Sequence, residues 1–125
     1  LATVRQDGSP RVSGTEVDFG EGELRLGSMP GARKARDLQR DPRFALHANP
    51  SDETMVDGDA KVAGRVREVT GAEFDRIMAG YPAELRESHL FVLDLDEAVL
   101  TTVSGNLLHI DLWRPGQGVR RSSRK

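Results

Sequence analysis

The sequence contains no cysteine, which excludes disulfide bonds and thiolate metal ligands from its stability and its chemistry. It also has no apolar run near the roughly 20 residues that a membrane helix needs, and no signal-peptide pattern. We therefore expect no membrane partner, and the cytoplasm is the expected compartment. Three histidines lack the spacing of metal ligands or of a catalytic triad, so the sequence predicts neither a metal site nor a catalytic side chain; they are His47, His89 and His109.

An excess of basic charge is missing as well. Lysine and arginine total 18 against 20 aspartates and glutamates, which gives a formal net charge of −2 and argues against a nucleic-acid partner. At 125 residues the chain suits one domain, which we expect over residues 1–114, followed by a flexible basic tail over residues 115–125. Because Leu1 already stands in a strand pattern, we also expect further residues to precede it.

The sequence does contain a series of short strand patterns separated by turn residues, beginning with a hairpin signal at Asp7-Gly8. Strands are expected over residues 1–5, 11–19, 23–27, 43–48, 60–68, 90–96, 98–104 and 107–113, with a polar loop over residues 49–58. One helix is expected over residues 32–40. A second begins at Thr70 with a predicted Thr-x-x-Glu capping box that includes Glu73. This pattern predicts a small, mostly antiparallel β-barrel with short helices, since closure removes exposed strand edges.

The segment over residues 24–38 carries the clearest chemical signal. A strand ends, a Pro-Gly turn follows, and Arg33 and Lys34 stand in the first turn of a helix. The helix dipole disfavours cations there by roughly 0.3–1 kcal/mol each, which indicates an anion bound between them. The free N–H groups of the helix start and the Ser28 hydroxyl would help to bind it. The alternative is a solvated face beside other arginines, and the residues alone leave both interpretations open.

Three stretches of the sequence, taken in their order along the chain, form a recognisable pattern. The chain opens with Leu-Ala-Thr-Val-Arg-Gln-Asp-Gly-Ser-Pro-Arg-Val, and the strand–turn–helix with Arg-Lys leads to Asp-Pro-Arg-Phe-Ala-Leu. The third stretch runs from Thr-Thr-Val at residues 101–103 to Leu-Trp-Arg-Pro-Gly at residues 112–116. This pattern resembles the pyridoxamine 5′-phosphate oxidase-like superfamily of FMN-binding proteins over nearly the whole chain. The resemblance implies a split β-barrel with antiparallel strands.

The resemblance also implies which residues bind the cofactor. Arg33 and Lys34 would clamp its phosphate, and Gly27 and Ser28 would line the phosphate and the ribityl chain. A segment of the second strand would run beside the isoalloxazine ring; it consists of Arg11, Val12, Ser13 and Gly14. The alternative is that these are ordinary strand residues, with Val12 in the core. Two residues near the C-terminus would reach the flavin of a partner subunit, unless the tryptophan merely packs; they are Trp113 and Arg114.

The activity implied by the resemblance is that of an oxidoreductase. It would transfer hydride between FMN or a deazaflavin coenzyme and an unknown small organic substrate, in a homodimer with the cofactor between its subunits. Vitamin B6 oxidase activity is not expected, because Leu107 replaces the arginine of the family's Arg-x-His. Asp59 stands near a position where those oxidases use glutamine, so the family's contact at that position is not expected here. The alternative is a non-catalytic barrel that stores a flavin or haem. Arginines that could form a basic groove for the deazaflavin's anionic tail are Arg36, Arg40, Arg65 and Arg67.

Overall fold

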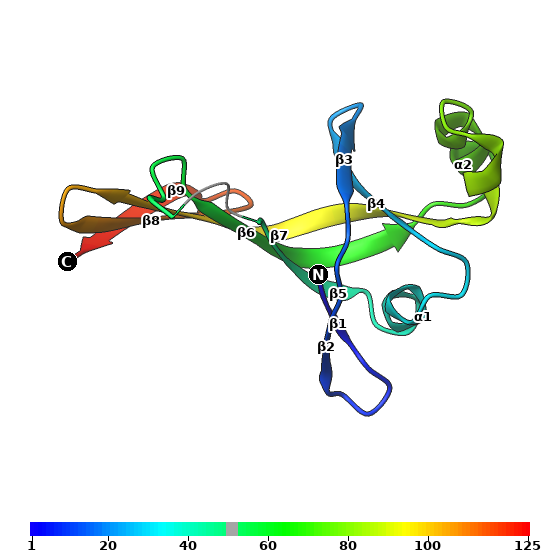
Figure 1. The fold of residues 1–125 in the computed structure, drawn as a ribbon, viewed down its shortest axis with the longest axis horizontal. Helices are drawn as coiled ribbons and strands as arrows, with labels where there is room; N and C mark the ends of the chain where they lie inside the picture. The colour runs from blue at the N-terminus through cyan, green and yellow to red at the C-terminus, as the bar shows by residue number, and fades with distance from the viewer. Residues whose placement is uncertain (50–52) are drawn as a thin grey trace. The chain divides into compact units, whose positions relative to one another are not determined.

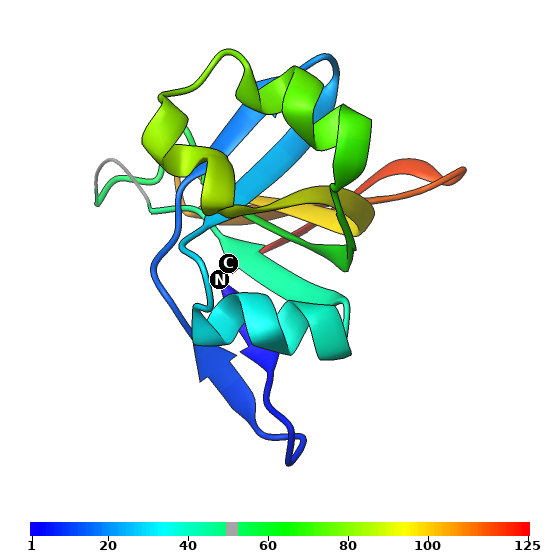
Figure 2. The same cartoon turned by 90° about the vertical axis from the view of Figure 1, so that its right-hand side faces the viewer.

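The computed structural model describes residues 1–49 and 53–125, so residues 50–52 of the expected loop lie outside the described residues. Within these ranges the chain forms nine strands, two α-helices and one 3-10 helix (Figures 1 and 2). The helices are α1 (Arg33–Arg40), α2 (Gly71–Met78) and the 3-10 helix η1 (Ala83–Glu87), and none in this part of the chain is long and apolar enough to span a membrane. The strands are β1 (Ala2–Val4), β2 (Pro10–Val12), β3 (Val17–Gly20), β4 (Glu23–Ser28), β5 (Arg43–His47), β6 (Asp59–Glu68), β7 (His89–Ser104), β8 (Leu107–Arg114) and β9 (Gly118–Arg124).

Hydrogen bonds join the strands in the order β2-β1-β5-β6-β7-β4-β3, and β8 pairs with both β7 and β9. The β1–β2, β3–β4, β4–β7, β7–β8 and β8–β9 ladders are antiparallel. The predicted fold class, a mostly antiparallel sheet with short helices, is therefore confirmed.

Two strand predictions are wrong in their boundaries. The strand expected over residues 11–19 is two strands, because β2 pairs with β1 whereas β3 pairs with β4. Conversely, the two strands expected over residues 90–104 form the single strand β7. Asp94 and Asp96 are exposed positions of this strand that alternate with the more buried Leu93 and Leu95. Charged residues on the outward face of a strand need no turn.

The expected flexible tail contains β9, so that prediction of its conformation is wrong. The chain reverses at Gly116 and Gly118, whose φ angles are 74° and 65°. Asp111 of β8 then lies opposite Arg121 of β9. Every residue of β9 is exposed, which accounts for the polar composition that predicted a flexible terminus. The domain limit at residue 114 stays a prediction.

Contacts divide the chain into two compact units, and each is described by itself. Unit 1 comprises residues 1–44 and 65–94, and unit 2 comprises residues 45–64 and 95–125. Among the described residues, every buried hydrophobic side chain except Val99 lies in unit 1. One cluster packs α2 and the strand ends beside it through Val69, Ile77, Met78 and Leu90.

Unit 2 consists mainly of the β7–β8–β9 ladders. Val99 lies opposite Leu112, and Val103 lies opposite Leu108, so these residues share one face of the sheet. Several large hydrophobic residues of this unit are exposed: Val56, Leu100, Val103, Leu107 and Val119.

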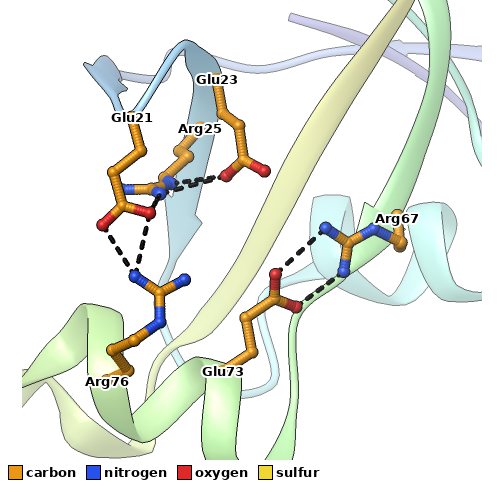
Figure 3. Close-up of polar contacts among 6 residues, drawn as sticks. All are labelled: Glu21, Glu23, Arg25, Arg67, Glu73 and Arg76. Atoms are coloured by element: carbon orange, nitrogen blue, oxygen red, sulfur yellow. Dashed lines mark hydrogen bonds and ion pairs between the residues drawn. The ribbon is translucent and has the colours of Figure 1, made fainter.

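Helix α2 begins without the predicted capping box. Thr70 occupies the N-cap position, but its side chain makes no capping hydrogen bond. Glu73 instead binds Arg67 of β6, whose Nη1 and Nη2 donate to the two carboxylate oxygens at 2.8 and 3.3 Å (Figure 3). These hydrogen bonds from Arg67 hold the pKa of Glu73 below its usual value. The ion pair therefore replaces the cap that the sequence pattern indicates.

Candidate functional site

Unit 1 contains a cavity of about 700 Å³. One wall is polar and comes from the end of β4 and the start of α1, with Ser28 and Lys34. Another wall is apolar and comes from the end of α2, from η1 and from the start of β7, with Met78, Leu85 and Leu90. Small-molecule sites are typically about 300–1,000 Å³ and combine an apolar lining with a few polar groups. The cavity has the size and the lining of such a site.

The polar wall has the properties of an anion site. Helix α1 has no side-chain cap and no acidic residue in its first turn. Lys34 Nζ donates to the backbone carbonyl of Gly14 at 2.9 Å and has no acidic partner among the described residues. Ser28 is buried, and its hydroxyl makes one long contact, 3.5 Å to the Met29 carbonyl. These donors are therefore available to an anion, because the groups that they contact are weak or neutral acceptors.

Arg33, the other half of the expected clamp, has a different position. It is exposed and does not line the cavity. Within the described ranges no side chain or carbonyl accepts a hydrogen bond from its guanidinium. The structure thus separates the two neighbouring cations into Lys34, which faces the cavity, and Arg33, which lies outside it.

A second cation lines the cavity, but acidic residues neutralise it. Arg25 of β4 is buried, and its guanidinium lies 3.0 Å from the Glu23 carboxylate and 3.5 Å from that of Glu21 (Figure 3). Arg76 of α2 also binds Glu21, at 2.7 Å. Of the described cations that line the cavity, Lys34 is therefore the one without an acidic partner.

Tyr81 and Asp18 form a further polar contact on the cavity wall. The Tyr81 hydroxyl donates to Asp18 Oδ2 at 3.2 Å. This hydrogen bond to a carboxylate raises the pKa of Tyr81 above its usual value. The contact with Asp18 therefore favours the neutral form of the Tyr81 hydroxyl.

Arg11, expected beside the flavin ring, instead binds Asp37 of α1. The buried Asp37 carboxylate accepts hydrogen bonds from Thr3 Oγ1 (2.8 Å), Arg11 Nε (2.7 Å) and Arg40 Nη2 (3.0 Å). Burial raises the pKa of Asp37, but the hydrogen bonds from Arg11, Thr3 and Arg40 outweigh it and hold the pKa below its usual value. This network fastens α1 beside β1 (Figure 2). Arg11 does not line the cavity and supports the helix that does.

The other three residues of the segment expected beside the flavin ring differ in whether they line the cavity. Gly14 lines the cavity and binds Lys34 through its carbonyl. The Ser13 N–H donates to the Leu1 carbonyl at 2.8 Å, as in an ordinary strand pair. Val12 is 84% exposed, so its alternative interpretation as a core residue is wrong. The cavity thus brings together Gly14, Gly27, Ser28 and Lys34 of the predicted residues.

The two predicted residues near the C-terminus lie at the end of β8 in unit 2. Trp113 is half-buried, and Arg114 lies 3.7 Å from the Glu97 carboxylate. Asp59, also in unit 2, lies 2.9 Å from His47 Nε2. The expected contact of Trp113 and Arg114 with a partner's flavin stays a prediction.

His89 also lines the cavity, although the sequence indicated no metal-binding or catalytic role for it. Its Nε2 lies 3.1 Å from the Gly31 N–H. No short motif signals this contact, because 58 positions separate the two residues. In the described ranges no group of three His, Asp or Glu residues could hold a metal ion.

Comparison with known proteins bears on this site. A family model described as pyridoxamine 5′-phosphate oxidase matches residues 1–103. A search of curated proteins found no match to the chain.

Solved structures share the fold. One is a pyridoxamine 5′-phosphate oxidase-related, FMN-binding protein from Nostoc punctiforme PCC 73102, with 15% identity, a TM-score of 0.70, and coverage of 99% of this chain and 84% of that one. Another is an F420 reductase, with 24% identity, a TM-score of 0.59, and coverage of 78% and 84%. A third is a heme binding protein from Mycobacterium smegmatis, with 23% identity, a TM-score of 0.58, and coverage of 99% and 50%. At these identities the likeness shows the fold, which is the predicted split barrel.

Proposed function

The chain belongs to the pyridoxamine 5′-phosphate oxidase family, and from this premise we propose that it is an oxidoreductase that binds a flavin-type nucleotide in the unit 1 cavity. The observation that carries the proposal is the ammonium group of Lys34, which lines the cavity beside Ser28 and has no acidic partner among the described residues. The substrate would be a small organic molecule that exchanges hydride with the cofactor.

The residues present fit a phosphate at the polar wall. Lys34 would supply the charge, while the Ser28 hydroxyl and the N–H groups at the start of α1 would supply further donors. Arg33 would add long-range attraction from outside the cavity. The apolar side chains of Met78, Leu85 and Leu90 would cover a flat ring and exclude water from it.

A bound flavin or deazaflavin supplies hydride transfer, and the protein supplies binding, orientation and electrostatics. Tyr81 would orient a substrate through its neutral hydroxyl, which Asp18 holds in place. Arg25 would contribute shape and little net charge, because Glu21 and Glu23 neutralise it. No side chain of the cavity needs to act as a nucleophile in this assignment.

FMN is the first candidate cofactor and a deazaflavin is the second. The deazaflavin's longer anionic tail would need the basic groove expected from four arginines. Two of these are already bound to acids, since Arg40 contacts Asp37 at 3.0 Å and Arg67 contacts Glu73 at 2.8 Å. This reduces the charge available to an anionic tail and favours the shorter nucleotide.

The proposed functional form is a homodimer. Unit 2 buries Val99 but exposes other large hydrophobic residues, so its sheet gains stability if a second copy covers it. Specific interfaces typically bury on the order of 1,200–2,000 Å² in total. The family resemblance adds that the cofactor would lie where two subunits meet.

Haem binding is the second candidate function, because a heme binding protein shares the fold. Haem iron in a protein needs an axial ligand, commonly a histidine. Among the described residues of the cavity the histidine is His89, and both of its ring nitrogens already face partners, Gly31 and Glu68. This geometry disfavours haem relative to a flavin.

The test of the proposed function is a titration of the wild type and two variants with FMN and with riboflavin, which lacks the phosphate. Lys34→Ala should weaken FMN binding by roughly ten- to a hundredfold, as expected for a lost charge-assisted hydrogen bond. Arg33→Ala should weaken it less, because Arg33 lies outside the cavity. Lys61→Ala, which removes an exposed lysine of unit 2, is the matched control and should leave affinity unchanged.

Riboflavin should bind the wild type and all three variants about equally. An FMN affinity unaltered by Lys34→Ala would show that the phosphate assignment is wrong. Absorbance of the purified protein then separates flavin from haem, and turnover of the reduced protein with an electron acceptor separates an enzyme from a storage protein.

A further inference from the structure

His89 at the start of β7 lies between two partners of opposite kind. Its Nε2 is 3.1 Å from the Gly31 nitrogen, and its Nδ1 is 3.2 Å from Glu68 Oε1. A backbone N–H can only donate, so Nε2 must carry a lone pair, whereas a carboxylate only accepts, so Nδ1 must carry the proton. A single form of the ring satisfies both contacts: the neutral tautomer protonated at Nδ1.

Gln39 of α1 helps to fix this tautomer. Its amide nitrogen donates to both oxygens of Glu68, at 3.1 and 3.2 Å, and so keeps the carboxylate beside the ring. The same nitrogen lies 3.4 Å from His89 Nδ1, but two donors cannot bond, so this proximity is not a hydrogen bond. Phe91 stacks on the ring with centroids 6.4 Å apart, and the His89 side chain is 18% exposed. The orientation of His89 is therefore set from three sides.

The partner of Nε2 belongs to the turn that leads into α1. The Ala32 N–H donates to the Met29 carbonyl at 3.1 Å, and Gly31 has a φ of 70°. With Pro30 before that glycine, the segment has the residues and the hydrogen bond of a type II turn. Lys34 follows Gly31 by three positions, so this turn leads directly into the first turn of the helix that carries it.

We propose that neutral His89 is a positioning residue that holds the Met29–Ala32 turn, and thereby Lys34 and the start of α1, in the arrangement that binds the cofactor's phosphate. The inference rests on the proposed function. Protonation of Nε2 would end the contact with the Gly31 N–H and loosen the turn, so phosphate affinity would fall in acid. Charged groups around the ring are Glu68 on β6 and, lining the same cavity, Lys34, Arg25, Asp18 and Glu16.

Two substitutions of His89 separate the acceptor from the titratable proton. His89→Gln can keep an acceptor near the Nε2 position and cannot be protonated, whereas His89→Leu keeps the bulk and removes the acceptor. At about pH 8 His89→Leu should weaken FMN binding about fivefold, the equivalent of one neutral hydrogen bond, and His89→Gln should stay within about twofold of wild type. Riboflavin should bind all three proteins alike.

Acid supplies the second arm. A protonated imidazole has no lone pair at Nε2, so on lowering the pH from about 8 to about 5.5 wild type should lose about fivefold in FMN affinity relative to His89→Gln. The phosphate of FMN also titrates in this range, but it does so for both proteins and cancels in the ratio. Equal pH profiles for the two proteins, or a gain of wild type over His89→Gln in acid, would overturn the proposal; such a gain would mean a direct contact between imidazolium and phosphate.

Hydrogen exchange of the Gly31 amide tests the same contact without any ligand. The amide should be protected in wild type and in His89→Gln, and it should lose protection in His89→Leu and in wild type at about pH 5.5, after correction for intrinsic exchange. Protection unaffected by His89→Leu overturns the role of His89 whatever binds in the cavity. If protection behaves as expected but wild type binds no FMN, the proposed function fails, and the phosphate part of this inference fails with it.

Discussion

Two arginine–aspartate pairs, one in each unit, have the same distance and different surroundings. Arg11 Nε lies 2.7 Å from Asp37 in unit 1, and Arg121 Nε lies 2.7 Å from Asp111 in unit 2. The side chains of Arg11 and Asp37 are 20% and 4% exposed, whereas those of Arg121 and Asp111 are 57% and 16% exposed. Burial multiplies the cost of breaking an ion pair, because the remaining charge cannot return to water. The distance alone thus says little about what a pair contributes.

The contrast extends to the units themselves. Unit 1 buries most of the apolar side chains and uses buried polar contacts to fasten α1 next to the cavity. Unit 2 buries Val99 and is otherwise a largely exposed set of strands. We interpret unit 1 as the part that carries the candidate cavity and unit 2 as a part that a second subunit would stabilise.

The largest effect is expected at the buried pair. Asp37→Ala should lower the free energy of unfolding by about 3 kcal/mol, because Arg11 and the buried Thr3 hydroxyl lose their acceptor. Asp37→Asn, which keeps one acceptor oxygen and no charge, should cost about half as much. Urea unfolding followed by circular dichroism measures both variants. A loss below about 1 kcal/mol for Asp37→Ala would mean that the network does not stabilise unit 1.

The pH dependence of this network follows from the direction of the pKa shift. Because the pKa of Asp37 is lower in the folded protein than in the unfolded chain, folding favours the carboxylate. Its contribution is fully present above the unfolded pKa, about 3.9, and is lost as pH falls through the lower folded value. Wild type should therefore lose stability more steeply than Asp37→Asn in strong acid, and the two should run parallel above about pH 5.

A pair of glycines offers the next largest contrast. Gly58 of unit 2 has a φ of 92°, and a Cβ there would lie 2.6 Å from Leu100 Cδ1 and 3.0 Å from Thr102 Cγ2. Gly71 of unit 1 has a φ of 64° but open space around its Cβ position. Gly58→Ala should cost about 2 kcal/mol and Gly71→Ala about 1 kcal/mol, since the second adds backbone strain without a clash. Equal losses would show that Leu100 moves aside freely.

The dimer dissociation constant should respond to a substitution in unit 2 and not to one in unit 1. Val103→Asp introduces a charge on the apolar face of unit 2 and should raise the dimer dissociation constant at least about tenfold. Gln6→Asp, at an exposed polar residue of unit 1, is the control and should change it little. Sedimentation over a concentration series measures both. A wild type that is monomeric at micromolar concentration with cofactor bound would contradict the proposed dimer.

Local signals predict most of the elements and fail where pairing decides. The turn before α1 is predictable because Pro30 and Gly31 restrict the chain at that point, and Gly31 does adopt a φ of 70°. The split between β2 and β3 is not, because it depends on which strands they pair with. Likewise β9 has the polar sequence of a flexible terminus and is a strand because β8 lies beside it.

The same division applies to the candidate site. Lys34 can be found in the sequence, because a cation in the first turn of a helix is a local anomaly. Ser28 can be found because it stands at the end of the strand just before that helix. Arg25 and His89 cannot, because each has the pattern of an ordinary strand residue until the fold places it at the cavity. Arg11 shows the converse, since its family position suggests the flavin whereas its guanidinium binds Asp37.

The smallest effect is expected at the exposed pair, and it completes the comparison with Asp37. Hydrogen bonds from Arg121 hold the pKa of Asp111 below its usual value, yet the arginine remains mostly in water. Asp111→Ala should therefore cost about a quarter or less of the Asp37→Ala loss. In 1 M salt the Asp111→Ala loss should disappear, because the Debye length is then about 3 Å and exposed charges are screened. The Asp37→Ala loss should persist in the same salt. If Asp111→Ala destabilises the protein as much as Asp37→Ala does, the β8–β9 pair is buried in solution, which would itself point to a second subunit covering that part of unit 2.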